Sequence, residues 1–451
     1  MKYWKIIAAL PLIAVSLWAA SPAVDKLLLP EDVYPQLDVL LKRAVQQSPQ
    51  MLNRMLDLEI AENNRIQARS NILPGVSAAY RHYQASDDRA DLSGRTNVTK
   101  VYYDVSIVQP VFHWGERRNN ARIGVIQQKI AEGNFRDGYR LLAQAIRQQY
   151  MQLVVYKILL QRSLLAQKYN QDVLKLSEER YSKGIMADAE IFPVRLNAER
   201  AEIDLERSRN DFESAKLSLA RLTGTALLED QAIPDEIPLL AHPTDVYKGL
   251  LADFLALKEP PTTQADNLRR QIEIENLTYL NHKTRLRPKF SLAAGITQDE
   301  QTYSINVAQK YRVNSLYGGI QVNWTIFDGL ASRAAVSSAL ARRRQLENDY
   351  QGLTERLGSE AQSQVKQLNF AARSMSIVDR LLIAADNGLR TKQGEFSRGV
   401  VSENDVTLTQ LARLNAFIDT QNARIDYLVR LTDLLGTIAQ DPVVDNVPAQ
   451  P

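Results

Sequence analysis

Four acidic residues, arranged in two matching pairs, are the side chains best placed for a chemical role. The pairs are Asp188 and Glu190, after Arg180-Tyr181-Ser182-Lys183-Gly184, and Glu403 and Asp405, after Phe396-Ser397-Arg398-Gly399. Each glycine interrupts a helical pattern, and glycine can take the positive φ that such a turn needs. Carboxylates in the first turn of the following helix are favoured by its dipole. Helix capping and the selection of cations therefore both stay open as roles for these residues.

The residue types that usually carry catalysis or bind metals show no such arrangement. The chain has no cysteine, which excludes disulfides, thiolate metal sites and cysteine nucleophiles. The histidines, none of which stands at metal-ligand spacing from another, are His82, His113, His242 and His282. No P-loop, dinucleotide fingerprint or G-x-S-x-G motif is present. The sequence therefore predicts a protein that is not an enzyme and uses neither cofactor nor metal.

The elements that position the acidic pairs occur twice along the chain. VSIVQPVFHWGERR, residues 105–118, and IQVNWTIFDGLASR, residues 320–333, share their alternation and their order of Phe and Gly. Phe112 and Phe327 are 215 positions apart, as are the two glycines of the helix breaks. This agreement predicts two copies of one structural unit. We place the repeats at 24–224 and 264–436, an irregular equatorial linker at 225–263, and a disordered tail at 437–451.

Each repeat contains two segments in which apolar and polar residues alternate. The predicted strands are 76–83 and 101–112 in the first repeat, and 290–298 and 316–327 in the second. Strands of this length and pattern are typical of a transmembrane β-barrel. A soluble sheet with one buried face alternates in the same way and remains the alternative. Aromatic residues beside these strands, such as Trp114 and Trp324, fit a membrane interface or a protein core.

Four strands are too few for a closed barrel, because about eight are needed to fill one. Lipid does not tolerate an open sheet edge. A membrane sheet of this size must therefore be completed by other chains, and three copies would supply twelve strands. The strand count thus predicts a homo-oligomer.

Two long stretches, 114–183 and 330–398, have the pattern of very long helices. About 70 helical residues span about 100 Å, far more than an average helix. Such helices need lateral partners along their whole length, which fits a wall of helices. An ordinary intramolecular coiled coil would show the same apolar stripe.

The N-terminus has the features of a secretory signal peptide. Lys2 and Lys5 precede an apolar run and then small residues, with cleavage expected after Ala23. A membrane anchor is the alternative, but the run is shorter than the roughly 20 residues that a span needs. The formal charge of +3 gives no support to a nucleic-acid surface. We expect an exported protein without a transmembrane helix.

The order of these motifs resembles that of the TolC-like outer membrane efflux proteins, from Leu37 to Gly436. The resembling motifs are Leu73-Pro74 and Arg287-Pro288 before strands, the strand-to-helix turns with Pro110, Phe112, Gly115, Phe327 and Gly329, and the two helix breaks. Each motif is weak alone, but together they occur twice in the same order.

This resemblance implies a mainly helical fold with a membrane sheet, assembled as a homotrimer. Its twelve-stranded β-barrel would lie in the outer membrane and continue into a long helical barrel, so that most of the chain lies in the periplasm. The trimer would be the passive exit duct of a tripartite efflux or type I secretion system. An inner-membrane transporter would deliver the cargo through a periplasmic adaptor.

The resemblance also assigns roles to the helix breaks. The breaks, with Arg180, Tyr181, Gly184, Phe396 and Gly399, would dock the adaptor. The acidic residues Asp188, Glu190, Glu403 and Asp405 would surround the periplasmic aperture. This sequence departs from the family pattern at Leu408, where a second acidic residue is expected, and at Val401, where an Arg sometimes stands. The main rival interpretation is a periplasmic helical-hairpin adaptor, which would share the leader and the long helices.

Overall fold

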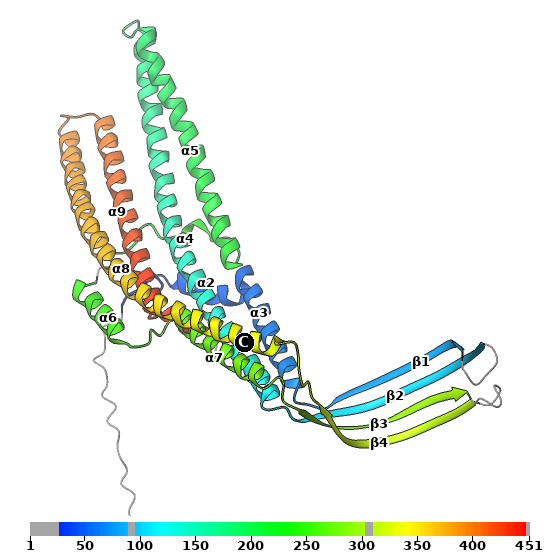
Figure 1. Ribbon diagram of the computed structural model, residues 1–451. Helices are drawn as coiled ribbons and strands as arrows, with labels where there is room; N and C mark the ends of the chain where they lie inside the picture. Colours follow the sequence, from blue (N-terminus) through cyan, green and yellow to red (C-terminus); the bar gives the residue numbers. More distant parts are fainter. Residues whose placement is uncertain (1–26, 89–94, 241, 303–309, 448–451) are drawn as a thin grey trace, which may run out of the picture.

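The structure is a computed structural model that describes residues 27–88, 95–240, 242–302 and 310–447. The predicted signal peptide, 1–23, lies outside these residues. The chain forms an elongated molecule, with two helical hairpins pointing away from a four-stranded sheet (Figure 1). The expected mainly helical fold with a small antiparallel sheet is confirmed. Within the described residues, no helix combines the length and the apolar content needed for crossing a membrane.

The same order of elements occurs in both halves of the chain. The first half contains α1 (Pro30–Val33), α2 (Pro35–Gln47), α3 (Pro49–Ser70), β1 (Gly75–Asp87), β2 (Thr96–Phe112), α4 (Glu116–Ser182) and α5 (Asp188–Thr223). The second contains α7 (Thr263–Lys283), β3 (Lys289–Thr302), β4 (Lys310–Asn323), α8 (Ala331–Ser397) and α9 (Glu403–Thr437). Between and after them lie η1 (Asp230–Ala232), α6 (Thr244–Ala256) and η2 (Pro442–Asn446).

The two longest helices, α4 and α8, have 67 residues each. At 1.5 Å per residue each is about 100 Å long. Neither contains proline, and each is supported along its length by neighbours. Helix α4 packs against α3, α5, α7 and α9, and α8 packs against α7 and α9. These lateral contacts stabilise helices that are far longer than propensity alone would support.

The sheet has the strand order β1-β2-β3-β4, and every neighbouring pair is antiparallel. Residues directly opposite one another in such a pair share a face. The apolar row Ala78, Val105, Ile296 and Leu316 lies on one face. The row Ser77, Ser106, Gly295 and Tyr317 lies on the other. The four alternating patterns therefore coincide in space and give one apolar and one mostly polar face.

The apolar face of the sheet is exposed in the single chain. Leu316 is 83% exposed and Ile320 is 72% exposed, and Val76 and Tyr80 are exposed as well. The strands make their main contacts with one another, and the helices lie beyond one end of the sheet (Figure 1). The main hydrophobic core lies instead where α2, α4 and α9 meet.

Several boundaries differ from those predicted. The strands are longer at most ends, but β4 stops at Asn323, so that Phe327 lies in the turn before α8. The linker 225–263 is not irregular throughout, because it contains α6, where Tyr247 and Phe254 are buried against the core. Prolines on both sides of α6 are the reason why the sequence predicted an irregular segment here.

The predicted disorder of the tail is wrong as far as Val447. Residues Pro442–Asn446 form η2, and Val443 is only 2% exposed. Asp441 pairs with Arg147 of α4, and Glu31 of α1 pairs with the same guanidinium. A buried ion pair fixes the tail, and a hydropathy pattern does not reveal such a contact.

Candidate functional site

The turn between α4 and α5 is closed by backbone hydrogen bonds around a glycine. Gly184 has φ +70°, and the amide of Ile185 donates to the carbonyl of Arg180 at 3.0 Å. The hydroxyl of Tyr181 donates to Asp188 across the turn, and this bond raises the pKa of Tyr181. The Arg195 guanidinium lies 5.7 Å from the Tyr181 ring centroid. Asp188 thus has a partner within its own hairpin.

The turn between α8 and α9 repeats this geometry. Gly399 has φ +76°, and the amide of Val400 donates to the carbonyl of Glu395 at 3.0 Å. Ser402 and Asp405 form a capping box, in which the Ser402 hydroxyl donates to the Asp405 carboxylate at 2.7 Å. The hydrogen bonds from the side chain and backbone of Ser402 hold the pKa of Asp405 below its usual value.

Helix capping is therefore a role that the geometry assigns to two of the four acidic residues. Glu190 accepts a hydrogen bond from the amide of Ala187 at 3.1 Å and caps α5, as Asp405 caps α9. Glu403 is exposed in the first turn of α9. Both hairpin turns lie at the same end of the molecule, opposite to the sheet (Figure 1). The capping geometry leaves a further role at an aperture as a proposal.

Exposed apolar side chains at both turns are a feature that the sequence reasoning missed. Ile185 is 71% exposed and Val400 is 69% exposed, each directly after the glycine of its turn. Phe396 and Leu408 are exposed as well, and Leu408 occupies the position where an acidic residue was expected. The matching positions of Ile185 and Val400 in the two repeats could have revealed them.

The strand-to-helix turns use positive φ at equivalent positions of the two repeats. The pairs are Trp114 (φ +55°) with Gly115 (φ +86°), and Gly329 (φ +64°) with Leu330 (φ +71°). A register shift of β2 between Pro110 and Phe112 precedes the first turn. The Phe112 ring then packs edge-on against Trp114, with centroids 4.8 Å apart. Two successive residues of this backbone conformation turn the chain sharply from strand into helix.

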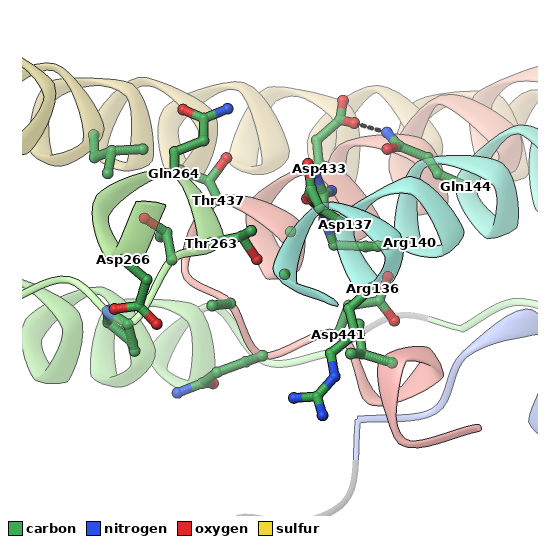
Figure 2. Close-up of a pocket in the computed structure, with 18 of the residues that line it drawn as sticks. Arg136, Asp137, Arg140, Gln144, Thr263, Gln264, Asp266, Asp433, Thr437 and Asp441 are labelled. Carbon is green, nitrogen blue, oxygen red and sulfur yellow. Dashed lines mark hydrogen bonds and ion pairs between the residues drawn. The ribbon is translucent and has the colours of Figure 1, made fainter. Parts of the chain in front are cut away.

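A polar cavity of about 890 Å³ lies among α4, α7, α8 and the end of α9 (Figure 2). Gln144 of α4 donates to Asp433 of α9. Burial raises the pKa of Asp433, while the Gln144 hydrogen bond and the nearby Arg430 and Arg140 act against this shift. Its lining residues come from distant parts of the sequence, so no local motif predicts it.

Among the residues that the structure describes, no three or more His, Asp or Glu side chains are grouped to hold a metal ion. Of the four histidines, His113 contacts Ser291, with 3.3 Å between Nε2 and the hydroxyl oxygen. This contact joins the first strand-to-helix turn to β3.

Comparisons with known proteins agree with this architecture. The model of the family described as outer membrane efflux protein matches residues 40–225, which lie within the first repeat. No curated protein matches the chain. The family is one of channels rather than enzymes, in line with the absence of catalytic motifs in the sequence.

Several solved structures share the fold over most of the chain. The outer membrane protein VceC from Vibrio cholerae is 17% identical, with 90% of this chain and 96% of that chain covered and a TM-score of 0.64. The CmeC outer membrane channel of Campylobacter jejuni is 15% identical, with 93% and 91% covered and a TM-score of 0.67. The open state of the MtrE outer membrane channel of Neisseria gonorrhoeae is 16% identical, with 90% and 89% covered and a TM-score of 0.60. The resemblance to TolC-like outer membrane efflux proteins is thus confirmed, by the family model in the first repeat and by the fold across both.

Proposed function

We propose that this chain forms the outer-membrane exit duct of a tripartite efflux or type I secretion system. The observation that carries the proposal is the exposed apolar face of the four-stranded sheet. Its apolar rows run across all four strands, and the helices leave them uncovered. A soluble protein rarely exposes an apolar patch of this extent. Lipid is the environment that stabilises it.

The two free edges of the sheet support assembly with further copies. Strands β1 and β4 each have a partner on one side only. Within a bilayer their unpaired N–H and C=O groups would be very costly, so the sheet has to close. Because β1 and β4 run in opposite directions, β4 of one copy can pair with β1 of the next as an antiparallel neighbour. Three copies give a twelve-stranded barrel.

The helical hairpins would then form the periplasmic part of the duct. Helices of about 100 Å are long enough to reach far from the membrane. Their turns, with Arg180, Tyr181, Gly184, Phe396 and Gly399, would dock a periplasmic adaptor, which in turn connects an inner-membrane transporter. The exposed apolar residues Ile185 and Val400 support this role, because adjacent apolar and charged groups are typical of a protein-binding surface. The duct itself would be passive.

The adaptor interpretation of the sequence is less compatible with this sheet. An adaptor would keep its β-domains soluble, with their apolar residues buried. Here Leu316 and Ile320 point away from any core of the chain, on a sheet with two open edges. In the sequence, the alternation of apolar and polar residues is compatible with both a duct and an adaptor. In the structure the apolar residues form one exposed face, which favours the membrane duct.

Cysteine pairs across the free edges test the assembly directly. The chain has no native cysteine, so every cross-link would come from the introduced residues. Ser77→Cys in β1 would be combined in turn with Ser315→Cys, Gly319→Cys and Gln321→Cys in β4, all on the polar face. After oxidation in membranes, we expect one of the three combinations to give covalent dimers and trimers but no larger species. Monomers alone in every combination would contradict the shared barrel.

A charge-specific test separates capping from a role at the aperture. Asp405→Asn keeps a carbonyl oxygen that can accept from Ser402 but removes the charge. If three copies of Asp405 surround the aperture, this variant should lower cation selectivity in a planar bilayer. Ser402→Ala, which weakens the cap and keeps the charge, serves as the control. An Asp405→Asn channel with unchanged reversal potentials would restrict Asp405 to capping.

A further inference from the structure

The connection between α7 and β3 carries a concentration of positive charge at the helix end of the sheet. Lys283, Arg285, Arg287 and Lys289 alternate with uncharged residues there. When the two repeats are aligned on the proline before the strand, the first repeat has Asn71, Leu73 and Gly75 in place of the last three. The helix-to-strand connection of the first repeat, from α3 to β1, therefore forms without cations at these three positions. The cations of the second repeat call for an explanation other than folding.

Two tryptophans fix the backbone of this connection. The Nε1–H of Trp114 donates to the carbonyl of Pro288 at 2.8 Å. The Nε1–H of Trp324 donates to the carbonyl of Leu286 at 3.0 Å. The guanidinium of Arg287, which lies between these two anchored residues, is 4.6 Å from the centroid of the Trp114 ring. Arg287 is thus held in a defined position, although its side chain is exposed.

The charges of this cluster are only partly compensated. Arg285 lies 3.9 Å from Asp328, whose carboxylate also accepts from Ser332. Lys289 pairs with Glu116 at 2.5 Å. Among the described residues, no carboxylate pairs with Arg287. The junction therefore presents one stacked guanidinium without a counter-ion, beside a second one whose partner is distant.

The cluster lies at the border of the apolar face. Trp324 follows directly after β4, in which Val322 and Ile320 belong to the apolar face, and Trp324 is 60% exposed. Phe112 and Phe290, opposite one another at the same end of the sheet, pack with centroids 6.4 Å apart. Tryptophan favours the zone where hydrocarbon meets headgroups. A guanidinium at this depth faces phosphate groups, which it can bind through two parallel hydrogen bonds.

We propose that Arg287, together with Arg285 and the two tryptophans, binds the headgroup phosphate of an anionic phospholipid in the periplasmic leaflet of the outer membrane. The inference rests on the proposed function, because it needs the sheet to lie in that membrane. The charge complementarity and the fixed position of Arg287 favour a specific lipid over a diffuse attraction. The chain has no cysteine that could carry a covalent lipid. A bound headgroup would give the barrel a fixed depth in the bilayer.

Tryptophan fluorescence offers a local test. Of the four tryptophans, Trp4 and Trp18 belong to the predicted signal peptide, so the mature chain has two reporters, Trp114 and Trp324, and both lie at the proposed site. The mature protein would be reconstituted in phosphatidylcholine vesicles that contain either dibrominated phosphatidylglycerol or dibrominated phosphatidylcholine. Bromine quenches tryptophan on contact. We expect the brominated anionic lipid to bind about fivefold more strongly for each arginine that contacts it.

The arginine variants identify the site. Adding Arg287→Gln should reduce this preference about fivefold, and adding Arg285→Gln should reduce it further. Arg287→Lys should retain only part of it, because the positive charge stays but the paired hydrogen bonds and the stacking on Trp114 are lost. Arg209→Gln, which removes an exposed arginine on α5, is the matched control and should change nothing. Heat-modifiable migration on a gel would show that each variant is assembled.

Three other outcomes would contradict either the lipid site or the membrane location of the sheet, on which the lipid site depends. Equal quenching by both lipids in the parent would refute specific binding while leaving the membrane sheet intact. A preference that millimolar phosphate abolishes, but chloride at equal ionic strength does not, would make the site one for free phosphate and overturn the lipid assignment. Quenching by neither lipid would show that the sheet is outside the bilayer, and the proposed function itself would fail.

Discussion

Replacing Arg147 by methionine should release both ends of the described chain from α4. The Arg147 side chain is only 1% exposed, and it donates to Asp441 at 2.8 and 3.0 Å and to Glu31 at 2.9 Å. Burial alone would lower the pKa of Arg147, but the hydrogen bonds and charges of Asp441 and Glu31 outweigh it and raise the pKa. The guanidinium therefore stays charged and holds α1 and η2 against the same turn of α4.

The size of the effect follows from what the substitution leaves behind. The methionine side chain would fill part of the volume, but Asp441, whose side chain is 2% exposed, would be left as a buried charge without a cation, with only the amide of Val443 donating to it. Removing one member of a buried ion pair costs about 3–5 kcal/mol. If opening of the terminal segments relieves this cost, their opening equilibrium should rise by about two to three and a half orders of magnitude.

Hydrogen exchange measured by mass spectrometry would detect this opening in peptides that cover 28–34 and 438–447. Arg430→Met, which removes a partly exposed pair with Asp426, is the control, and its effect should be below about 1 kcal/mol. A triple variant with Arg147, Glu31 and Asp441 all replaced by apolar residues should recover much of the protection, because no charge stays buried. Unchanged exchange in both peptides of Arg147→Met would refute the clamp.

Two further predictions concern the sheet and the turn of α9. A Cβ on Gly295 would lie 2.6 Å from the backbone carbonyl oxygen of Val105 in the neighbouring strand, which cannot move without shifting the sheet. Gly295→Val should therefore abolish the heat-modifiable oligomer on gels, whereas Gly319→Val, with open space, should not. Hydrogen bonds from Ser402 lower the pKa of Asp405. The charged carboxylate therefore stabilises the turn fully at pH values above the ordinary pKa of 3.8, and this stabilisation is lost as the pH falls through the lowered pKa. The rate of pepsin cleavage at the turn should therefore rise in the parent as the pH falls over that range, and should rise less in Ser402→Ala. Parallel plots of cleavage rate against pH for the two proteins would contradict the cap.

The elements of the fold were predictable because the signals that define them are local. Gly184 and Gly399 end the long helices where the sequence indicates, and the positive φ of both explains the residue type. Period-two alternation located all four strands, and the register brought their apolar residues to one face. The ends were less certain: β4 stops at Asn323, and the chain turns into α8 only at Gly329 and Leu330.

The features that the sequence did not reveal depend on contacts between distant residues. Arg147 meets Asp441 and Glu31 only after both ends of the chain have folded onto α4. An ion pair of this kind has no periodicity, so the tail was predicted to be disordered. In the same way, the acidic residues after each glycine suggested capping, but only the geometry identified Glu190 and Asp405 as the caps. The proposed arrangement of these residues around an aperture would depend on other copies of the chain.

Single-particle imaging of the mature protein, purified from outer membranes, tests the central claim most directly. The account predicts a cylinder with threefold symmetry, about 140 Å long or more, from the lengths of α4 and of the strands. One end, formed by β1 to β4, should lie in the detergent belt, and the turns at Gly184 and Gly399 should lie at the other. A monomer, or a short compact particle without a detergent belt, would contradict the duct and make the sheet a soluble one.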